Sequence, residues 1–329
     1  MKGRSLGVAF TYVGAVVGAG FASGQEIYQF FGRFGTAGVW GIGIAGALFA
    51  WLGYLALESG RRGRAASFGA LLESLYPASL VRVAEGVTTA FLVIGLGVVA
   101  AGGGAASQQI IGLPVFWGAL ATSLFIVLVV ARGTDSVVRV NVALVPYLVV
   151  LVMMVALLTW HQPARLRVGS AHGWALSALL YLSYNIFTGI MVLIGIGPRL
   201  TGRRDSVLAA VGGAVLLSGL ALMEHHALSR LHTPGALPML DLAARVHPVW
   251  GTLYGVSLWI ALFTTGVAEA YALRTQYGRR VLWLVGATFL FSIWGFQRLV
   301  ATLYPLMGVV AVVLWIPLVY RPKQSASGG

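Results

Sequence analysis

The sequence has 329 residues, of which 58% are hydrophobic and only 9% are charged, whereas charged residues make up about a quarter of a soluble globular domain. This composition excludes an ordinary soluble enzyme, and it argues against a nucleic-acid partner despite a formal net charge of +13. It indicates an integral membrane protein, in which basic residues record orientation and contact with anionic lipid. The absence of cysteine excludes disulfides and thiolate metal sites.

The apolar segments are long enough for ten membrane-spanning helices. Each needs about 20 residues, so ten use roughly 200 and leave no room for a separate soluble domain. The predicted helices are 5–31, 37–60, 80–108, 113–131, 138–160, 172–197, 206–226, 248–274, 281–297 and 300–319. Two segments between them, 65–77 and 235–247, are too short to cross. We therefore expect an all-α integral membrane protein with one polytopic membrane domain, 1–329.

The distribution of basic residues predicts the orientation. With the N-terminus in the cytoplasm, sixteen Lys and Arg residues fall on the cytoplasmic side and six on the other. This positive-inside bias favours an even number of spans with both ends in the cytoplasm and 321–329 as a cytoplasmic tail. The first apolar segment lacks a convincing cleavage site and is interpreted as a retained helix. The predicted location is a prokaryotic cytoplasmic (inner) membrane.

The first predicted helix, 5–31, contains a segment unsuited to a continuous helix. Four glycines lie within 14–24 and are followed by Gln25 and Glu26. Gly14 and Gly18 form a GxxxG pair, which by itself is consistent with close helix packing. Packing does not explain Ser23, Gln25 and Glu26, because polar groups inside a bilayer need partners or a cavity. We predict a break at this point.

The sixth predicted helix, 172–197, has a similar polar segment at 183–189. Its midpoint follows that of the first helix by about half the chain, so the layout divides into repeats at approximately 5–161 and 172–320. Five helices followed by five place the second repeat upside down in the membrane. Inverted repeats that begin with broken helices are typical of secondary transporters, whose substrate and ions bind at the midplane. We expect the helices 5–31 and 172–197 to be broken there.

The eighth predicted helix, 248–274, places Ala261, Thr264, Thr265 and Ala268 on one face at helical spacing. Each Thr hydroxyl can bond back to its own helix, which is the ordinary structural explanation. Beside two broken helices, the same hydroxyls are candidate cation ligands.

These three segments resemble the LeuT-fold, or amino acid-polyamine-organocation, transporter superfamily. The string 18–26 is similar, more narrowly, to its YkvI-like membrane proteins. The resemblance covers nearly the whole chain, and it implies a sodium ion as coupling ion with no other cofactor. The implied sodium ligands are the backbone carbonyls of Gly14, Val17 and Ala261 and the hydroxyls of Thr264 and Thr265. Carbonyl and hydroxyl oxygens suit a hard cation.

Two acidic residues keep proton coupling open. Some proton-coupled relatives place a lysine from the fifth helix at the cation position, and 138–160 contains no lysine. Glu269 could tune the cation site, carry a proton or pair with Arg274. Glu26 could pair with a substrate ammonium, take up a proton or bond to Gln25 and nearby backbone.

The resemblance also implies a substrate site between the two broken helices. Its candidate residues are Ala19, Gly20, Ala22, Ser23, Ser183, Tyr184, Asn185, Phe187 and Thr188. Amides freed by the break suit a carboxylate, Tyr184 and Asn185 could orient it, and Phe187 is a candidate hydrophobic lid. The sequence 224–226, Glu-His-His, is interpreted as an interfacial cluster.

The favoured function is a sodium-coupled symporter of an amino acid or similar small zwitterionic solute, working by alternating access. A proton-coupled transporter and a non-transporting small-molecule receptor on the same fold are the alternatives. An enzyme is not expected, since no zinc-ligand motif or nucleophile–base pair lies at membrane depth.

Overall fold

The computed structural model describes residues 3–63, 73, 77–132, 135–166 and 172–319, with the backbone alone described for 135–145 and 314–319. Every regular element in these ranges is helical. The helices are α1 (Gly3–Val16), α2 (Ala19–Ala22), α3 (Gln25–Phe30), η1 (Gly32–Phe34), α4 (Thr36–Arg61), α6 (Ala78–Ile111), α7 (Val115–Arg132), α8 (Asp135–Leu158), α9 (Trp174–Ile196), η2 (Gly197–Arg199), α10 (Arg203–Leu228), α11 (Pro238–Val246), α12 (Pro248–Tyr277), η3 (Arg279–Val281), α13 (Leu282–Ala287), η4 (Thr288–Ile293) and α14 (Phe296–Val319). The short segment predicted at 235–247 corresponds to α11. The tail 321–329 and most of the segment 65–77 lie outside the described residues.

Seven helices of the described part are long and apolar enough to span a membrane: α4, α6, α7, α9 with η2, α10, α12 and α14. The other three predicted spans differ in form. The first is divided into α1, α2 and α3, and the fifth has an apolar stretch of described side chains only at Pro146–Leu158. The ninth, predicted as one helix at 281–297, is instead a succession of η3, α13 and η4, which ends where Gly295 adopts a left-handed φ of 81°. A 3₁₀ segment rises about 2.0 Å per residue, so it covers more length than an α-helix of equal size.

The predicted break in the first helix is present, and it has two parts. At the first, Gly18 is extended (φ −99°, ψ −174°) and its amide donates to the Val16 carbonyl at 3.0 Å instead of continuing the α-helical pattern. At the second, Gly24 has a left-handed φ of 82°. A side chain at Gly24 would place Cβ 3.1 Å from the Met239 amide nitrogen, so glycine is required by both conformation and space.

The predicted break in the sixth helix is wrong, because α9 runs without interruption from Trp174 to Ile196. Its polar side chains bond to carbonyls of their own helix. Ser183 Oγ donates to the Leu179 carbonyl at 2.6 Å, Asn185 Nδ2 to the Tyr181 carbonyl at 3.1 Å and Thr188 Oγ1 to the Asn185 carbonyl at 2.9 Å. Such bonds satisfy polar groups inside an apolar helix without unwinding it.

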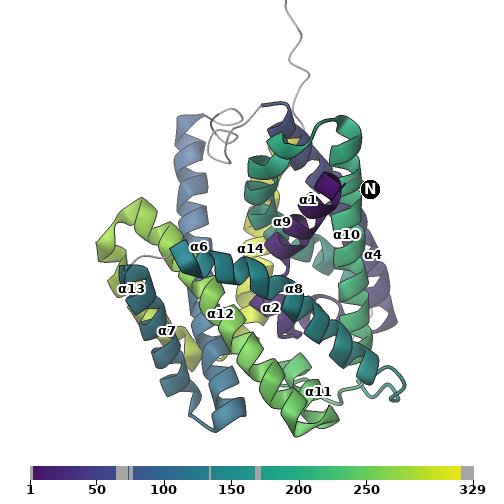
Figure 1. Ribbon diagram of the computed structural model, residues 1–329, viewed down its shortest axis with the longest axis vertical. Coiled ribbons are helices and arrows are strands. Elements are labelled where there is room, and N and C mark those ends of the chain that lie inside the picture. Colours follow the sequence, from purple (N-terminus) through teal and green to yellow (C-terminus); the bar gives the residue numbers. More distant parts are fainter. Residues whose placement is uncertain (1–2, 64–72, 74–76, 133–134, 167–171, 320–329) are drawn as a thin grey trace, which may run out of the picture.

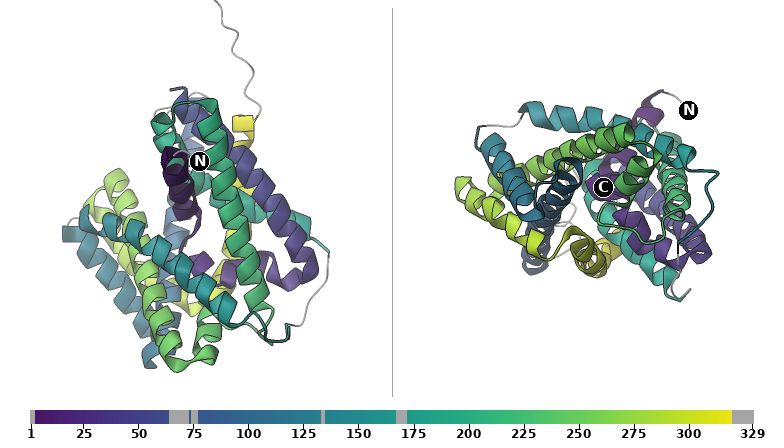
Figure 2. Two further views of the ribbon diagram at one scale, coloured as in Figure 1. Left: turned by 45° about the vertical axis from the view of Figure 1, so that its right-hand side comes forward. Right: turned by 90° about the horizontal axis from the view of Figure 1, so that it is seen from below.

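The broken first segment lies inside the bundle. Figure 1 shows α2 at the centre of the molecule, where it contacts α12, while α3 contacts α9, α10 and α14. The N-terminus lies toward the upper end of this view and α11 lies at the lower end. Figure 2 shows α1 alongside α10 from a second direction, in agreement with the contacts between them.

Tyr12 anchors α1 among its neighbours. It is fully buried, and its hydroxyl donates to the Phe49 carbonyl of α4 at 2.8 Å. Glycines on two facing helices make room for its ring. A Cβ added at Gly53 would lie 2.7 Å from Tyr12 Cε1, and a Cβ added at Gly213 would lie 2.6 Å from Tyr12 Cδ1. The ring thereby fixes the position of α1 just before the break.

Candidate functional site

The break leaves backbone polar groups of α2 unequally satisfied. The first bonds of this short helix run from the Ala22 amide to the Gly18 carbonyl and from the Ser23 amide to the Ala19 carbonyl. The amides of 19–21 precede these bonds and have no partner within the helix. At the other end, the Ala22 carbonyl accepts from the Tyr254 hydroxyl at 2.5 Å, and the Ser23 carbonyl accepts from the Met239 amide at 3.0 Å.

The Ser23 hydroxyl holds the second part of the break. It donates to the Gly20 carbonyl at 2.6 Å and accepts from the Gln25 amide at 3.1 Å. Gly20 itself lies against Glu26, whose Oε1 would overlap a Cβ at this position. Gly20 therefore allows the carboxyl group of Glu26 to fold back onto the unwound segment. Of the candidate substrate residues here, Ser23 is already engaged within the break.

Glu26 and Tyr184 connect the broken segment to α9. The Tyr184 hydroxyl donates to Glu26 Oε2, and both residues are buried. The Tyr184 ring stacks on Phe30, with ring centroids 5.7 Å apart, and lies 4.9 Å from the ring centroid of Tyr304. An aromatic cluster of α3, α9 and α14 thus surrounds this acidic group.

The remaining candidate residues of α9 do not bridge to the broken segment through the bonds described above. Ser183, Asn185 and Thr188 donate within their own helix. Phe187 is buried and packs edge-to-face on Phe91 of α6, with centroids 5.1 Å apart. Tyr184 is therefore the α9 side chain most directly placed to act with the break.

The candidate cation residues lie at the end of α1, in the break and on α12. Gly14 and Val17 flank the first part of the break, and the Gly18 amide bonds to Val16 rather than to the Gly14 carbonyl four residues earlier. On α12, buried Thr264 donates from Oγ1 to the Ala261 carbonyl at 3.1 Å. Thr264 therefore makes the bond to its own helix that is the ordinary structural explanation, and this bond places two of the five candidate oxygens side by side.

Glu269 lies further along α12, in the contact with α6. Its carboxyl group packs against Gly95, where a Cβ would lie 2.8 Å from Glu269 Cδ. Oε2 is buried and has no hydrogen-bond partner among the described residues. Glu269 forms no ion pair with Arg274, and the guanidinium of Arg274 instead donates to the Val130 carbonyl of α7.

Glu224, which the sequence analysis interpreted as part of an interfacial cluster, is a buried acidic residue. Its side chain is fully buried, and neither carboxyl oxygen has a hydrogen-bond partner among the described residues. Its helix, α10, contacts α3, the helix that carries Glu26. Helical periodicity could have indicated the burial of Glu224, because Leu217 and Leu220 lie seven and four residues earlier on the same buried face.

Four further polar residues lie near the broken segment, and of these the sequence analysis singled out only Gln25. Gln25 is fully buried and both ends of its side-chain amide lack partners within the described structure. The rings of Tyr181 and Tyr304 lie 5.9 and 4.9 Å from the ring of Tyr184, centroid to centroid, and the Tyr254 hydroxyl donates to the Ala22 carbonyl. Tyrosines within apolar helices read as ordinary core residues, so the sequence offered no distinguishing signal for them.

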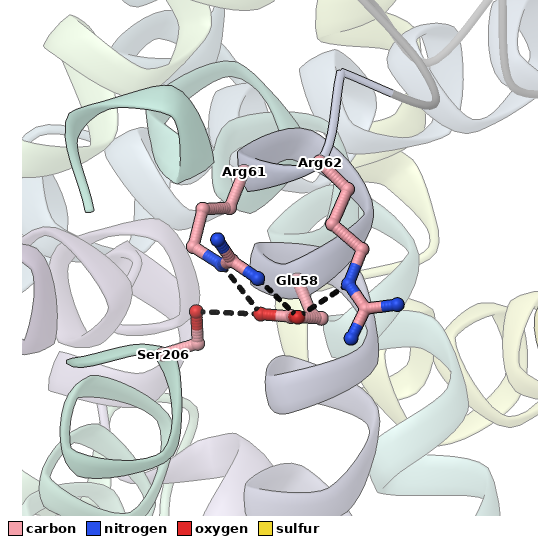
Figure 3. A network of polar contacts seen from close by, with 4 residues as sticks. All are labelled: Glu58, Arg61, Arg62 and Ser206. Carbon is pink, nitrogen blue, oxygen red and sulfur yellow. Dashed lines mark hydrogen bonds and ion pairs between the residues drawn. The ribbon is translucent and has the colours of Figure 1, made fainter. Parts of the chain in front are cut away.

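Ion pairs in the described residues are confined to Glu58, at the end of α4 (Figure 3). This carboxylate accepts from Arg61 Nε and Nη2 at 2.8 and 2.6 Å and from Arg62 Nε at 2.6 Å, while Ser206 of α10 donates to it at 3.0 Å. No basic side chain therefore pairs with Glu26, Glu224 or Glu269 in the described structure. Nor does any group of three or more His, Asp or Glu side chains there form a metal site.

Comparison with solved structures defines the class of fold. A manganese transporter of Eremococcus coleocola (H236A mutant) superposes with a TM-score of 0.64 over 96% of this chain and 78% of that one, at 15% identity. MhsT in complex with L-phenylalanine superposes with a TM-score of 0.58 over 94% of this chain and 88% of that one, at 18% identity. The chain is an all-helical membrane protein whose fold is similar to that of LeuT-fold transporters.

Sequence comparison gives a narrower relationship. The chain is a homologue of the uncharacterized membrane protein YkvI of Bacillus subtilis, with 28% identity over 94% of both chains. A second Bacillus subtilis protein, the uncharacterized YyaD, is 24% identical over 95% of both chains. No family model matches the sequence.

Proposed function

We propose that this protein is a sodium-coupled symporter of an amino acid or similar small zwitterionic solute. The observation that carries the proposal is the two-part break at the centre of the bundle, which frees backbone groups beside a buried acidic residue. Among the similar structures, MhsT is in complex with L-phenylalanine, which supports a small amino acid-like solute. The proposed mechanism is alternating access around this central site.

The chemistry of the break supports a zwitterion. The amides of 19–21 lack intrahelical partners and point their donor dipoles toward the unwound segment, which suits a carboxylate. Glu26, at the other side of Gly20, can accept hydrogen bonds from an ammonium group, with Tyr184 orienting the carboxylate. We assign Ala19, Gly20, Tyr184 and Glu26 to the core of the proposed solute site, with the other candidate residues around it.

Sodium is the proposed coupling ion, bound where the break meets α12. The loss of the helical bond between the Gly18 amide and the Gly14 carbonyl makes that carbonyl available, and the Ala261 carbonyl and Thr264 hydroxyl are already adjacent. Val17 and Thr265 would complete a set of oxygen ligands suited to a hard cation. Glu269, one turn beyond Thr265, is proposed to tune this site.

The proposed membrane arrangement has ten spans in a 5+5 inverted repeat, with both termini in the cytoplasm of a bacterial cell. The seven candidate spans, the divided first segment, α8 and the η3–α13–η4 segment together supply ten membrane-crossing units. The excess of Lys and Arg on the side of the N-terminus supports this orientation.

Proton coupling is the second candidate, and a specific observation favours it. Glu26 and Glu224 are buried in the bundle and Glu269 is half-buried with a buried Oε2, and none of the three has a basic partner in the described structure. A carboxyl group in such a place is costly to ionise unless a cation lies beside it, and otherwise it retains a proton. Each of the three is therefore a candidate proton carrier.

Removal of one hydroxyl group distinguishes sodium coupling from proton coupling. Thr265→Val keeps the shape of the side chain and removes one proposed ligand, so the concentration of NaCl needed for half-maximal thermal stabilisation should rise roughly tenfold or more, the scale of a lost contact to a charged group. The matched control is Thr275→Val, because Thr275 is exposed on α12 and bonds only to the Ala272 carbonyl. Equal sodium responses in the two variants would contradict the assignment and favour proton coupling.

A further inference from the structure

Two neighbouring cavities lie along α1. The first has a volume of about 680 Å³ and lies between α1, α8, α9 and α10, with Gly14, Met153 and Gly219 among its lining residues. The second has a volume of about 650 Å³ and lies at the start of α1 and the end of α9, with Arg4, Val8 and Arg199 in its lining. Thr11 lines both cavities, so they adjoin along one face of α1.

The first cavity opens toward lipid. Its rim includes Phe10, Val150 and Val215, which are 56%, 60% and 64% exposed. Apolar side chains exposed on membrane-spanning helices face the hydrocarbon core, where acyl chains replace water. Pro146, Thr11 and the glycines leave a lining without any charged residue. An acyl chain is the occupant that this environment supplies.

The lining of the second cavity contains two guanidinium groups beside apolar side chains. Arg4 and Arg199 form no ion pair with the described residues, and the lining of this second cavity contains no acidic residue. The acidic residue nearest in sequence to this lining is Asp205, whose carboxylate accepts from the hydroxyls of Ser5 and Thr201. Both arginines belong to the side of the protein with excess positive charge, where anionic head groups lie.

We propose that a phospholipid with an anionic head group binds along α1, with its phosphate between Arg4 and Arg199 and one acyl chain in the apolar cavity. Ten residues separate Arg4 from Gly14, which on a helix is about 15 Å, or half the roughly 30 Å hydrocarbon core. The two cavities therefore match one leaflet of the bilayer. The acyl chain would end beside Gly14, at the start of the break. The cavity adjoins Gly14, a proposed sodium ligand, but the lipid proposal rests on the cavity linings and does not depend on the proposed transport function.

Two sets of variants test the two ends of the lipid separately. Arg4→Gln with Arg199→Gln removes the head-group contacts, and Arg280→Gln is the control, because Arg280 is exposed on the same predicted side but lies outside the cavity. Gly219→Leu fills the apolar cavity, since a Cβ there meets nothing within 4 Å. Gly43→Leu is its control, as Gly43 is equally open and lies on α4, outside the lining. Val150→Trp is a second filling variant on α8.

The measurement is native mass spectrometry of purified full-length protein with phosphatidylglycerol and with phosphatidylcholine of identical acyl chains. The wild type should retain phosphatidylglycerol preferentially, and the double arginine variant should bind it about 25-fold more weakly, since each basic residue near an anionic surface contributes about fivefold. Gly219→Leu and Val150→Trp should reduce binding of both lipids. Retention equal to that of the controls would overturn the proposal, as would binding of soluble glycerol phosphate as tightly as phosphatidylglycerol.

Discussion

At the scale of single residues, Glu26 shows how a carboxyl group can be kept in an apolar bundle. It accepts a hydrogen bond from a phenol and not from a cation, and the aromatic rings of Phe30, Tyr184 and Tyr304 lie around it. Gly20 provides the space into which it folds back. The group is thereby directed toward the unwound backbone, where the ammonium of a zwitterion is proposed to bind.

Removing the Tyr184 hydroxyl should weaken solute binding without unfolding the protein. Tyr184→Phe retains the ring that stacks on Phe30 and removes the donor to Glu26. Loss of a hydrogen bond to a charged group costs about 1.5–3 kcal/mol, so affinity for the solute should fall by roughly ten- to a hundredfold. Equilibrium binding of radiolabelled amino acids measures this. Tyr271→Phe, at an exposed position of α12, is the control, and equal affinities of the two variants would move the solute site away from Tyr184.

Glu224 has a different environment, since neither of its carboxyl oxygens has a hydrogen-bond partner in the described structure. Glu224→Gln keeps the size of the side chain and removes the charge, so it should raise stability by about 1–3 kcal/mol when the carboxyl would otherwise be ionised. The gain should therefore be larger at pH 9 than at pH 5. Thermal melting of the purified variant and wild type at both pH values checks this. A gain that is independent of pH would show that ionisation of Glu224 carries no cost.

At the scale of elements, the first and sixth helices show which sequence pattern predicts a helix break and which does not. Four glycines within 14–24 gave the chain two positions that leave helical geometry, and it breaks at Gly18 and Gly24. The segment 183–189 contains polar residues with one glycine, and it stays helical. Polarity alone did not predict a break, because hydroxyl and amide side chains bond to carbonyls of the same helix. Backbone freedom, rather than polarity, decided the outcome.

Gly24→Ala should destabilise the protein more than a left-handed conformation alone accounts for. The φ of 82° costs a residue with Cβ roughly 1–2 kcal/mol, and contact with Met239 adds to it. Gly112→Ala is the matched control, because Gly112 has a φ of 72° with nothing within 4 Å of a Cβ. The difference in melting temperature between the two variants measures the Met239 contact. Equal decreases in melting temperature would show that α11 moves away from the added methyl group without loss of stability.

Gly213→Ala should loosen α1 from α10. The new Cβ would lie 2.6 Å from Tyr12 Cδ1, and overpacking of this kind costs about 1–3 kcal/mol. Gly219→Ala, on the same helix with open space around its Cβ, should be neutral or stabilising because alanine favours a helix. Thermal unfolding in detergent compares the two. A stable Gly213→Ala variant would mean that Tyr12 does not fix α1.

At the scale of the whole molecule, composition and hydropathy predicted the membrane class and the order of the helical segments along the chain. They could not predict which side chains meet at the centre. Glu224 and Tyr304 are distant in sequence from Glu26, and the packing of α10 and α14 against α3 brings their helices to it. Met239 of α11 likewise reaches the carbonyl of Ser23, so that a segment too short to span closes one end of the break. Such contacts depend on tertiary structure, which periodicity does not encode.

Solute uptake into liposomes tests the central claim most directly. Purified protein is reconstituted, loaded with potassium buffer and diluted into sodium buffer containing pooled radiolabelled amino acids, with a proton gradient as the comparison. A sodium-coupled symporter predicts accumulation above the external concentration, which collapses when an ionophore dissipates the sodium gradient. Accumulation driven only by the proton gradient, or binding without accumulation under either gradient, would contradict the account.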